Sequence, residues 1–496
     1  MTVTAERPQR GDREATIDAC AQCFDVAIIG GGISGACLYD RMCREGYRVL
    51  LVDRADFGSG TSQASAMMIW GGLLYLRQFD FGTVWKLSGA RDDLIVATGL
   101  PIRTQRFRYI PALDRGHNAF KIRAALWLYW LLGRRRRCAP SAENTYPEQA
   151  FMRAKLFGRS HVYEEGVLET SDCRFVLEWI LPHRPPDHCA LNYCALESAA
   201  HRDSRWHLEL VDRHLGGELK VSAKMLVNAA GVWTDRIHQL CGLTSPYKHV
   251  FSKGVFIAIP RPAEHDDSLI FDMGEHGDGQ TFHPWGPVSL WGPTETAVDS
   301  PESGFRVAAG DVRFLLAQAN KNLNVNIDAS DIVSLRCGIR PLAVKRGYSA
   351  GRHPLDCSRK HLVHHDRANA AIAIYGGKLT SCRELASEIM ARLKAQLRPS
   401  GTPNSDCYTA LQGADKLAPE PSWCRDNELC LTLDDYLRRR SNIAQWVPRR
   451  GLGRDDSNLD EVRAAARAIE GERANAALER YRSRVREEYD ALLASV

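Results

Sequence analysis

Three glycines near the start of the chain, Gly30, Gly32 and Gly35, have the GxGxxG spacing of a phosphate-binding turn. They follow a β-rich run, 24–29, and a helical pattern comes directly after them. Gly30 allows a tight turn, Gly32 lets the backbone approach a pyrophosphate, and Gly35 lets the helix pack closely on the strand. The N–H groups at the start of the helix can then bind phosphate oxygens. This pattern predicts a bound dinucleotide.

An acidic residue stands where the ribose of a dinucleotide needs a hydrogen-bond acceptor. A second strand-like run, 47–52, ends on Asp53, about 20 residues after the glycines. Strand, turn, helix and acid together favour a dinucleotide-binding βαβ unit over a glycine-rich turn in some other doubly wound domain. The motif does not distinguish FAD from NAD.

Composition narrows the class of protein. The chain has 496 residues, enough for two or three domains, with 44% hydrophobic and 25% charged residues and a net charge of +5. This balance gives no indication of a nucleic-acid partner. The 15 cysteines show no zinc spacing beyond one C-x-x-C, Cys20 and Cys23, so we expect free thiols in a reducing cytoplasm and no metal. The polar first ~20 residues predict a disordered leader, not a secretory signal.

One segment resembles a membrane contact. Nine apolar residues, Ala124–Leu132, precede Gly133 and four arginines, 134–137. This is too short for a bilayer, which needs about 20 residues. One interpretation is a partly covered helix with a solvated basic end. The other is an interfacial anchor, Ala124–Arg137, which would place the protein peripherally on the inner face of a membrane.

Further glycine-rich junctions follow the first. After Asp53 comes a run of small residues that ends in GGLLYL, 71–76. LVNAAGVWTD (226–235) and YGGKLTSCRELA (375–386) each join a strand to a helix. With the first turn, this set resembles the FAD-dependent glycerol-3-phosphate dehydrogenases of the D-amino-acid-oxidase-like flavoprotein superfamily. FHPW, WGPTET, CGIRPL and LTLDDYLRRR match the same family in order, so the resemblance covers roughly residues 24–490.

The resemblance implies an α/β plus α+β fold. A Rossmann-like FAD domain of the glutathione-reductase type would comprise about 23–110, 155–245 and 330–397. An antiparallel-sheet substrate domain would be inserted at about 110–155 and 246–330. A leader (1–22), a linker (398–422) and a C-terminal helical domain (423–496) complete this prediction.

The resemblance also implies FAD as the cofactor. Its pyrophosphate and ribose would lie at the first turn, its adenine near NAAGVW, and its flavin against YGGKLT, where helix N–H groups stabilise negative charge on the ring. The residues predicted to bind FAD are Gly30, Gly32, Ile33, Ser34, Gly35, Asp53, Arg54, Thr61, Ser62, Gly71, Gly72, Ala230, Gly231, Gly377, Lys378, Leu379 and Thr380.

At the expected substrate site the chain departs from its family. Where the family has lysine, histidine and arginine in SSKLIHGGLRYL, this chain has Met67, Trp70 and Leu74. Phe256 stands at a further histidine position. These four residues would form an apolar wall, so we expect a larger or less polar substrate than glycerol 3-phosphate.

Several polar groups of the family site remain. Arg340, Arg359 and Lys378 would supply donors to an anion, and Tyr75 would lie near the flavin. Because the family's histidines are missing, His283 becomes the predicted catalytic base. Arg340, Lys378, His283 and Tyr75 are therefore the predicted catalytic residues, and Arg340 and Arg359 bind substrate with the apolar wall.

Three functions stay open. The first is oxidation of a C–H beside a hydroxyl in a small phosphorylated or carboxylated substrate, with a quinone or oxygen as electron acceptor. The second is an amine or amino-acid oxidase that uses oxygen, in which Arg340 binds a carboxylate. The third is a non-catalytic flavin-binding protein. A homodimer is also expected.

Overall fold

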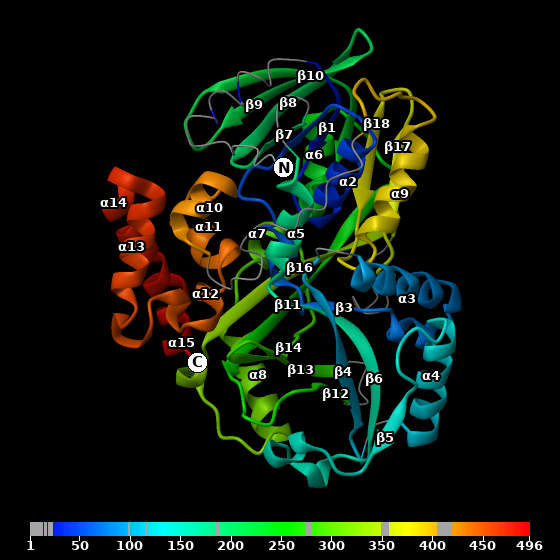
Figure 1. The fold of residues 1–496 in the computed structure, drawn as a ribbon, viewed down its shortest axis with the longest axis vertical. Coiled ribbons are helices and arrows are strands. Elements are labelled where there is room, and N and C mark those ends of the chain that lie inside the picture. Colours follow the sequence, from blue (N-terminus) through cyan, green and yellow to red (C-terminus); the bar gives the residue numbers. More distant parts are fainter. Residues whose placement is uncertain are drawn as a thin grey trace, which may run out of the picture.

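The computed structural model describes residues 13, 17, 23–97, 100–114, 117–183, 188–272, 279–348, 357–403 and 419–496. Most of the predicted leader and linker lies outside these residues. Figure 1 shows two halves, each built on a sheet, with the C-terminal helices along one flank.

The first sheet carries the dinucleotide motif. Its order is β17-β18-β10-β1-β2-β7, with β8 and β9 continuing from β10. Parallel pairing of β1 with β2 and β10 places the glycine turn at the centre of the sheet. The strands are β1 (Cys23–Ile29), β2 (Val49–Val52), β7 (His188–Leu191), β8 (Cys194–Arg202), β9 (Arg205–Asp212), β10 (Glu218–Asn228), β17 (Leu362–Asp366) and β18 (Ala371–Tyr375).

Helices cover one face of this sheet. Three of them, α2 (Ile33–Arg44), α5 (Asp172–Ile180) and α9 (Cys382–Leu393), share one hydrophobic core with β1, β2 and β18. On the other face, β8 and β9 fold over the apolar side chains of β1 and β2. The short helix α6 (Thr234–Leu240) follows β10. Figure 1 shows α2 and α9 side by side in this half.

The second sheet forms the other half. Its order is β15-β11-β14-β13-β12-β4-β6-β3, with β16 paired to β11 and β5 to β6. The strands are β3 (Met68–Ile69), β4 (Ile102–Pro111), β5 (Ser141–Glu143), β6 (Ser160–Leu168), β11 (Tyr247–Pro260), β12 (Ser268–Asp272), β13 (Gly279–Trp285), β14 (Val288–Gly292), β15 (Thr296–Val298) and β16 (Ser334–Lys345).

This pairing corrects the predicted domain boundaries. Strands β3, β4, β6 and β16 were expected in the dinucleotide domain, but all four hydrogen-bond into the second sheet. Strand β4 pairs antiparallel with β6 over Ile102–Tyr109 and in parallel with β12 over Phe107–Pro111, so both of its neighbours belong to the second sheet. The substrate half is therefore larger than the sequence suggested.

Helices also line the second sheet. The helix α8 (Ala309–Asn322) covers one core. Across the sheet, α3 (Phe81–Val96), α4 (Ala119–Leu132) and the 3₁₀ segment η2 (Leu73–Gln78) flank β4 and β6, as Figure 1 shows. Among the described residues, no helix has both the length and the apolar character to cross a bilayer.

The C-terminal helices are fastened to the dinucleotide half by buried charge. Arg439 and Arg440 bond the carboxylate of Asp56 at 2.6 and 2.7 Å, and all three side chains are buried. The two guanidinium groups hold the pKa of Asp56 well below its usual range, although burial opposes this. The helices are α10 (Pro421–Asn427), α11 (Leu433–Asp435), α12 (Ile443–Trp446), α13 (Leu459–Glu470), α14 (Ala474–Val485) and α15 (Ala491–Ala494).

Candidate functional site

A cavity of about 1140 Å³ runs from the glycine turn after β1 into the second sheet. This exceeds the ~300–1,000 Å³ of sites for drug-sized ligands, so an extended ligand suits it better. One end is lined by Gly30, Gly32 and Asp53, and the other by Arg340 and Lys378.

The glycine turn has the conformation that a phosphate needs. Gly30 has φ +109°, which side chains disfavour, and a Cβ on Gly35 would lie 1.9 Å from the Gly30 carbonyl oxygen. Helix α2 begins with no capping side chain and no acidic residue in its first turn. The Ile33 N–H instead bonds the Ser62 hydroxyl at 3.0 Å. Partial positive charge therefore faces the cavity.

Asp53 lines the cavity beside the first glycine turn. Its carboxylate accepts from the N–H groups of Gly31 and Ala55 at 2.8 and 3.0 Å. Burial raises the pKa of Asp53 to about 6 despite those bonds, so the group is mostly ionised at neutral pH. Beside it, the Arg54 guanidinium lies 4.1 Å from the ring centre of Trp233. Acceptor, cation and aromatic surface thus meet where a nucleoside would lie.

A second glycine turn shapes the opposite end. Gly376 and Gly377 have φ +72° and +125°, and a Cβ on Gly377 would lie 3.0 Å from Ser34. The Gly376 N–H donates to Nε2 of His249 at 3.0 Å, so that nitrogen is unprotonated. Burial lowers the pKa of His249 to about 4, which keeps the imidazole neutral. The second glycine turn therefore packs against Ser34 in the first turn of α2.

Lys378 points from this turn to Tyr75. Its ammonium donates to the Tyr75 hydroxyl and lies 4.3 Å from the centre of that ring. Burial lowers the pKa of Lys378 to about 7, with Arg359 and Lys360 adding repulsion. Burial also raises the pKa of Tyr75 to about 12, so the phenol stays protonated. Lys378 can therefore exchange a proton near neutral pH.

Two arginines share one carboxylate at this end. Glu295 lies 3.1 Å from Arg340 and 3.3 Å from Arg359. The Ser252 hydroxyl also donates to Glu295. All three charged residues line the cavity, so this cluster has two fixed cations and one fixed anion, with Lys378 as a titratable third cation.

The rest of this end is apolar. Trp70, Leu74, Phe256 and Met68 line it, and Leu74 is 41% exposed at the mouth. The apolar wall predicted from the sequence is therefore present, with Met68 in place of Met67.

Comparison with known proteins identifies the family of this chain. The sequence profile of the family described as "FAD dependent oxidoreductase" matches residues 25–383. The chain belongs to this family. A glycerol-3-phosphate dehydrogenase from Pseudomonas tolaasii is 27% identical over 389 residues, 77% of this chain and 74% of that protein.

Solved flavoprotein structures share the fold. The glycerol-3-phosphate dehydrogenase from Bacillus halodurans complexed with FAD superposes with a TM-score of 0.69 at 18% identity, over 97% of both chains. Glycine oxidase from Geobacillus kaustophilus gives 0.50 at 17% identity, over 76% of this chain and 96% of that one.

The cavity of this flavoenzyme has the groups that FAD requires. The N-terminus of α2, which has no capping side chain, can bind the pyrophosphate, and the Asp53 carboxylate can accept hydrogen bonds from the ribose. The second glycine turn leaves room for the flavin. Most residues predicted to bind FAD line it. They are Gly30, Gly32, Ile33, Ser34, Asp53, Arg54, Thr61, Ser62, Ala230, Gly231, Gly377, Lys378 and Leu379. Of the predicted substrate residues, Arg340, Arg359, Trp70, Leu74 and Phe256 line it as well.

Other predicted residues lie behind the lining. Gly71 donates its N–H to the buried Glu165 at 3.0 Å, and Gly72, in a left-handed conformation, directly precedes η2. Thr380 is buried beyond the second glycine turn. Met67, which directly precedes β3, is fully buried against Arg336. Met67 is therefore corrected as a substrate contact, whereas contacts of Gly71, Gly72 and Thr380 with FAD stay predictions.

His283 is likewise corrected as the base. It is on β13, where Gly279 and Thr281 on the same face line the cavity, but it lies further along the strand. There its Nδ1 lies 2.7 Å from the Ser268 hydroxyl and its ring stacks on Phe107. Burial lowers the pKa of His283 to about 3, so this imidazole is a sheet residue without access to substrate.

Two functional residues were missed. Glu295 lies within the WGPTET segment but has no spacing that predicts contact with Arg340. His249, which accepts the Gly376 N–H, is far from it in sequence. A lone acid in an otherwise uncharged stretch was the one available signal for Glu295.

Proposed function

We propose that this flavoenzyme oxidises a C–H beside a hydroxyl in a small anionic substrate bound between Arg340, Arg359 and Lys378. The observation that carries the proposal is the grouping of these three cations with an apolar wall at the end of the cavity opposite the phosphate-binding turn. FAD, when bound, would serve as the hydride acceptor. A non-catalytic protein would have no use for a lysine held near its neutral form.

Lys378 is the proposed base. A base works best when its pKa lies near the working pH, and burial lowers the pKa of Lys378 to about 7. In its neutral form the amine can take the hydroxyl proton as the hydride leaves. Tyr75 stays protonated and orients Lys378 through their hydrogen bond.

The charges favour a substrate other than glycerol 3-phosphate. Glu295 offsets one of the two arginines, so with Lys378 neutral the cluster has a net charge near +1. One negative charge is matched better than two, and Trp70 and Phe256 favour an apolar substrate body.

The same charge count supports a second candidate. A carboxylate is a monoanion, and an amino acid would place it on Arg340 while its amine, once neutral, needs no separate base. Glu295 beside Arg340 is the specific feature that favours an amine or amino-acid oxidase.

Anaerobic mixing separates these candidates. The FAD-loaded enzyme is mixed with 2-hydroxy acids, hydroxyalkyl phosphates and amino acids, and flavin bleaching is followed. We expect bleaching by a hydroxy substrate with an apolar body, more slowly by glycerol 3-phosphate. Bleaching by amino acids alone would transfer the proposal to the second candidate. Flavin that no compound reduces would refute both.

The electron acceptor is proposed to be a membrane quinone. Large apolar side chains are exposed around the cavity mouth and along α3 and α4: Leu74, Phe79, Phe81, Trp85, Phe120, Trp127, Leu128 and Leu131. Phe79 and Leu74 line the cavity itself, and exposed arginines 134–136 follow α4. This surface suits shallow insertion into an anionic bilayer, whose quinone would then meet the mouth of the cavity.

Vesicle flotation tests this surface. A Phe79→Ser/Phe120→Ser variant should lose most of its binding to anionic vesicles, whereas Phe314→Ser, an exposed phenylalanine on α8, should bind as wild type. Equal flotation of the wild type and both variants would contradict membrane contact through this surface, and oxygen would then become the proposed acceptor.

A further inference from the structure

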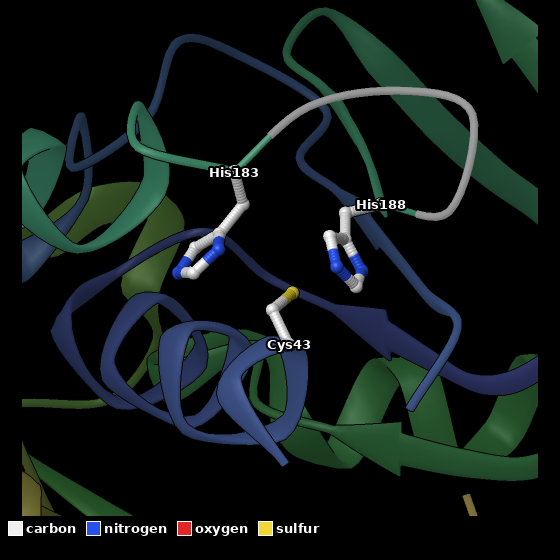
Figure 2. A group of neighbouring side chains, drawn as sticks. All are labelled: Cys43, His183 and His188. Atoms are coloured by element: carbon white, nitrogen blue, oxygen red, sulfur yellow. The ribbon is translucent and has the colours of Figure 1, made fainter. Parts of the chain in front are cut away.

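A second group of side chains lies at the far end of α2 from the cavity. Cys43 is in the last turn of α2, His183 follows α5, and His188 is the first residue of β7. One ligand atom from each lies within 4.8 Å of the others. Figure 2 shows the sulfur pointing between the two imidazole rings. We propose that Cys43, His183 and His188 bind one zinc ion.

The ligand chemistry is that of zinc. Thiolate and neutral imidazole are its preferred ligands, and two histidines separated by four residues fall within the H-x₃₋₅-H spacing of zinc sites. Bonds of about 2.0–2.3 Å in a tetrahedron place ligand atoms about 3.5 Å apart. Closing the group from 4.8 Å or less needs only small side-chain movements. The thiol proton leaves on binding, and water completes the fourth position.

A carboxylate already orients one of the ligands. Nε2 of His183 lies 2.9 Å from Asp40, which leaves Nδ1 for the metal. Both oxygens of Asp40 accept from Arg44 at 2.9 Å, so the carboxylate is itself fixed. Carboxylate–histidine–zinc arrangements of this kind hold the ring and raise its basicity.

Burial places the proposed ion inside the fold. Cys43 is fully buried, His183 is 8% exposed and His188 is half-buried. β7 is the edge strand of the first sheet and α2 presents its first turn to the cavity. An ion bound here would join the edge strand to the phosphate-binding helix and stabilise the folded state, because the unfolded chain lacks the site. This proposal does not depend on the substrate of the enzyme.

Zinc competition against a chromophoric chelator tests the site on the FAD-loaded enzyme. We expect one tightly bound zinc per chain, lost in Cys43→Ala and retained in Cys37→Ala, which removes a second buried thiol of the same helix. Asp40→Asn should weaken binding about 10–100-fold. Equal zinc content in the two cysteine variants, or no binding tighter than micromolar in wild type, would overturn the proposal.

Two further measurements test the site even if the Cys43→Ala protein fails to fold. His188→Gln changes a half-buried residue, and zinc should raise the melting temperature of wild type but not of this variant. Cobalt bound to wild type should give tetrahedral d–d bands beyond the flavin absorption, and these should be absent in His188→Gln. An equal thermal shift in both proteins, or cobalt bands that persist in the variant, would refute the site.

Discussion

At the nucleotide end of the cavity the contacts come mainly from the backbone, whereas at the substrate end they come from side chains. Gly30, Gly32 and the first turn of α2 offer N–H groups whose positions follow from φ and ψ. Arg340, Arg359 and Glu295 form their contacts across separate strands and loops. A backbone site admits few sequences, while a side-chain site can change specificity by single substitutions. The sequence predicts that this chain keeps the first and has altered the second.

The strongest test of this contrast is steric. In Gly35→Val, the new Cβ would lie 1.9 Å from the Gly30 carbonyl, so helix and turn must separate. We expect the flavin-to-protein ratio to fall about tenfold or more. Gly310→Ala on α8, where no atom lies within 4 Å of the new Cβ, is the control and should keep its flavin. A Gly35→Val protein with full flavin would contradict the backbone account.

The next test removes the proposed base. Lys378→Met should lower kcat about 10²–10⁴-fold and leave FAD bound. Because the neutral amine is the active form, wild-type activity should rise as the pH rises through about 7. This rising limb of the pH–rate profile should be absent in the variant. Lys360→Met, at an exposed lysine nearby, should keep the rate at high pH and the pH limb, which should move to slightly higher pH because one repulsive charge is lost. A limb that survives in Lys378→Met would assign the titration to another group.

The smallest expected effect is electrostatic. In Glu295→Gln, both arginines lose their shared carboxylate, so the site becomes more positive. KM for a phosphate-bearing substrate should fall about fivefold, equivalent to about 1 kcal/mol for a partly screened charge. Glu302→Gln, at an exposed acid, should change nothing. A higher KM in Glu295→Gln would show that this carboxylate mainly positions the arginines.

The sequence predicted local geometry better than distant contacts. Gly30, Gly32, Ile33 and Ser34 line the cavity as expected, and so do the residues from Gly377 to Leu379, because each turn is built from neighbours in the chain. Glu295 was missed because its partners approach only when the second sheet forms.

Strand alternation has a similar limit. It tells which residues share a face, but not how far along that face the cavity extends. Thr281 lines the cavity, and His283 on the same face is covered by Phe107. The direction of the Gly71 N–H depends on Glu165, in a strand far away in the sequence.

The buried bonds from Arg439 and Arg440 to Asp56 bear on how such enzymes can be recombined. Asp56 lies three residues after Asp53, the predicted ribose ligand, and lines the same cavity. A chimera that replaced the C-terminal helices with a sequence lacking these arginines would leave an unpaired buried carboxylate, at a cost of about 3–5 kcal/mol. That cost would arise at a residue of the cavity lining. A chimera should therefore take the C-terminal helices and the segment that contains Asp56 from the same parent.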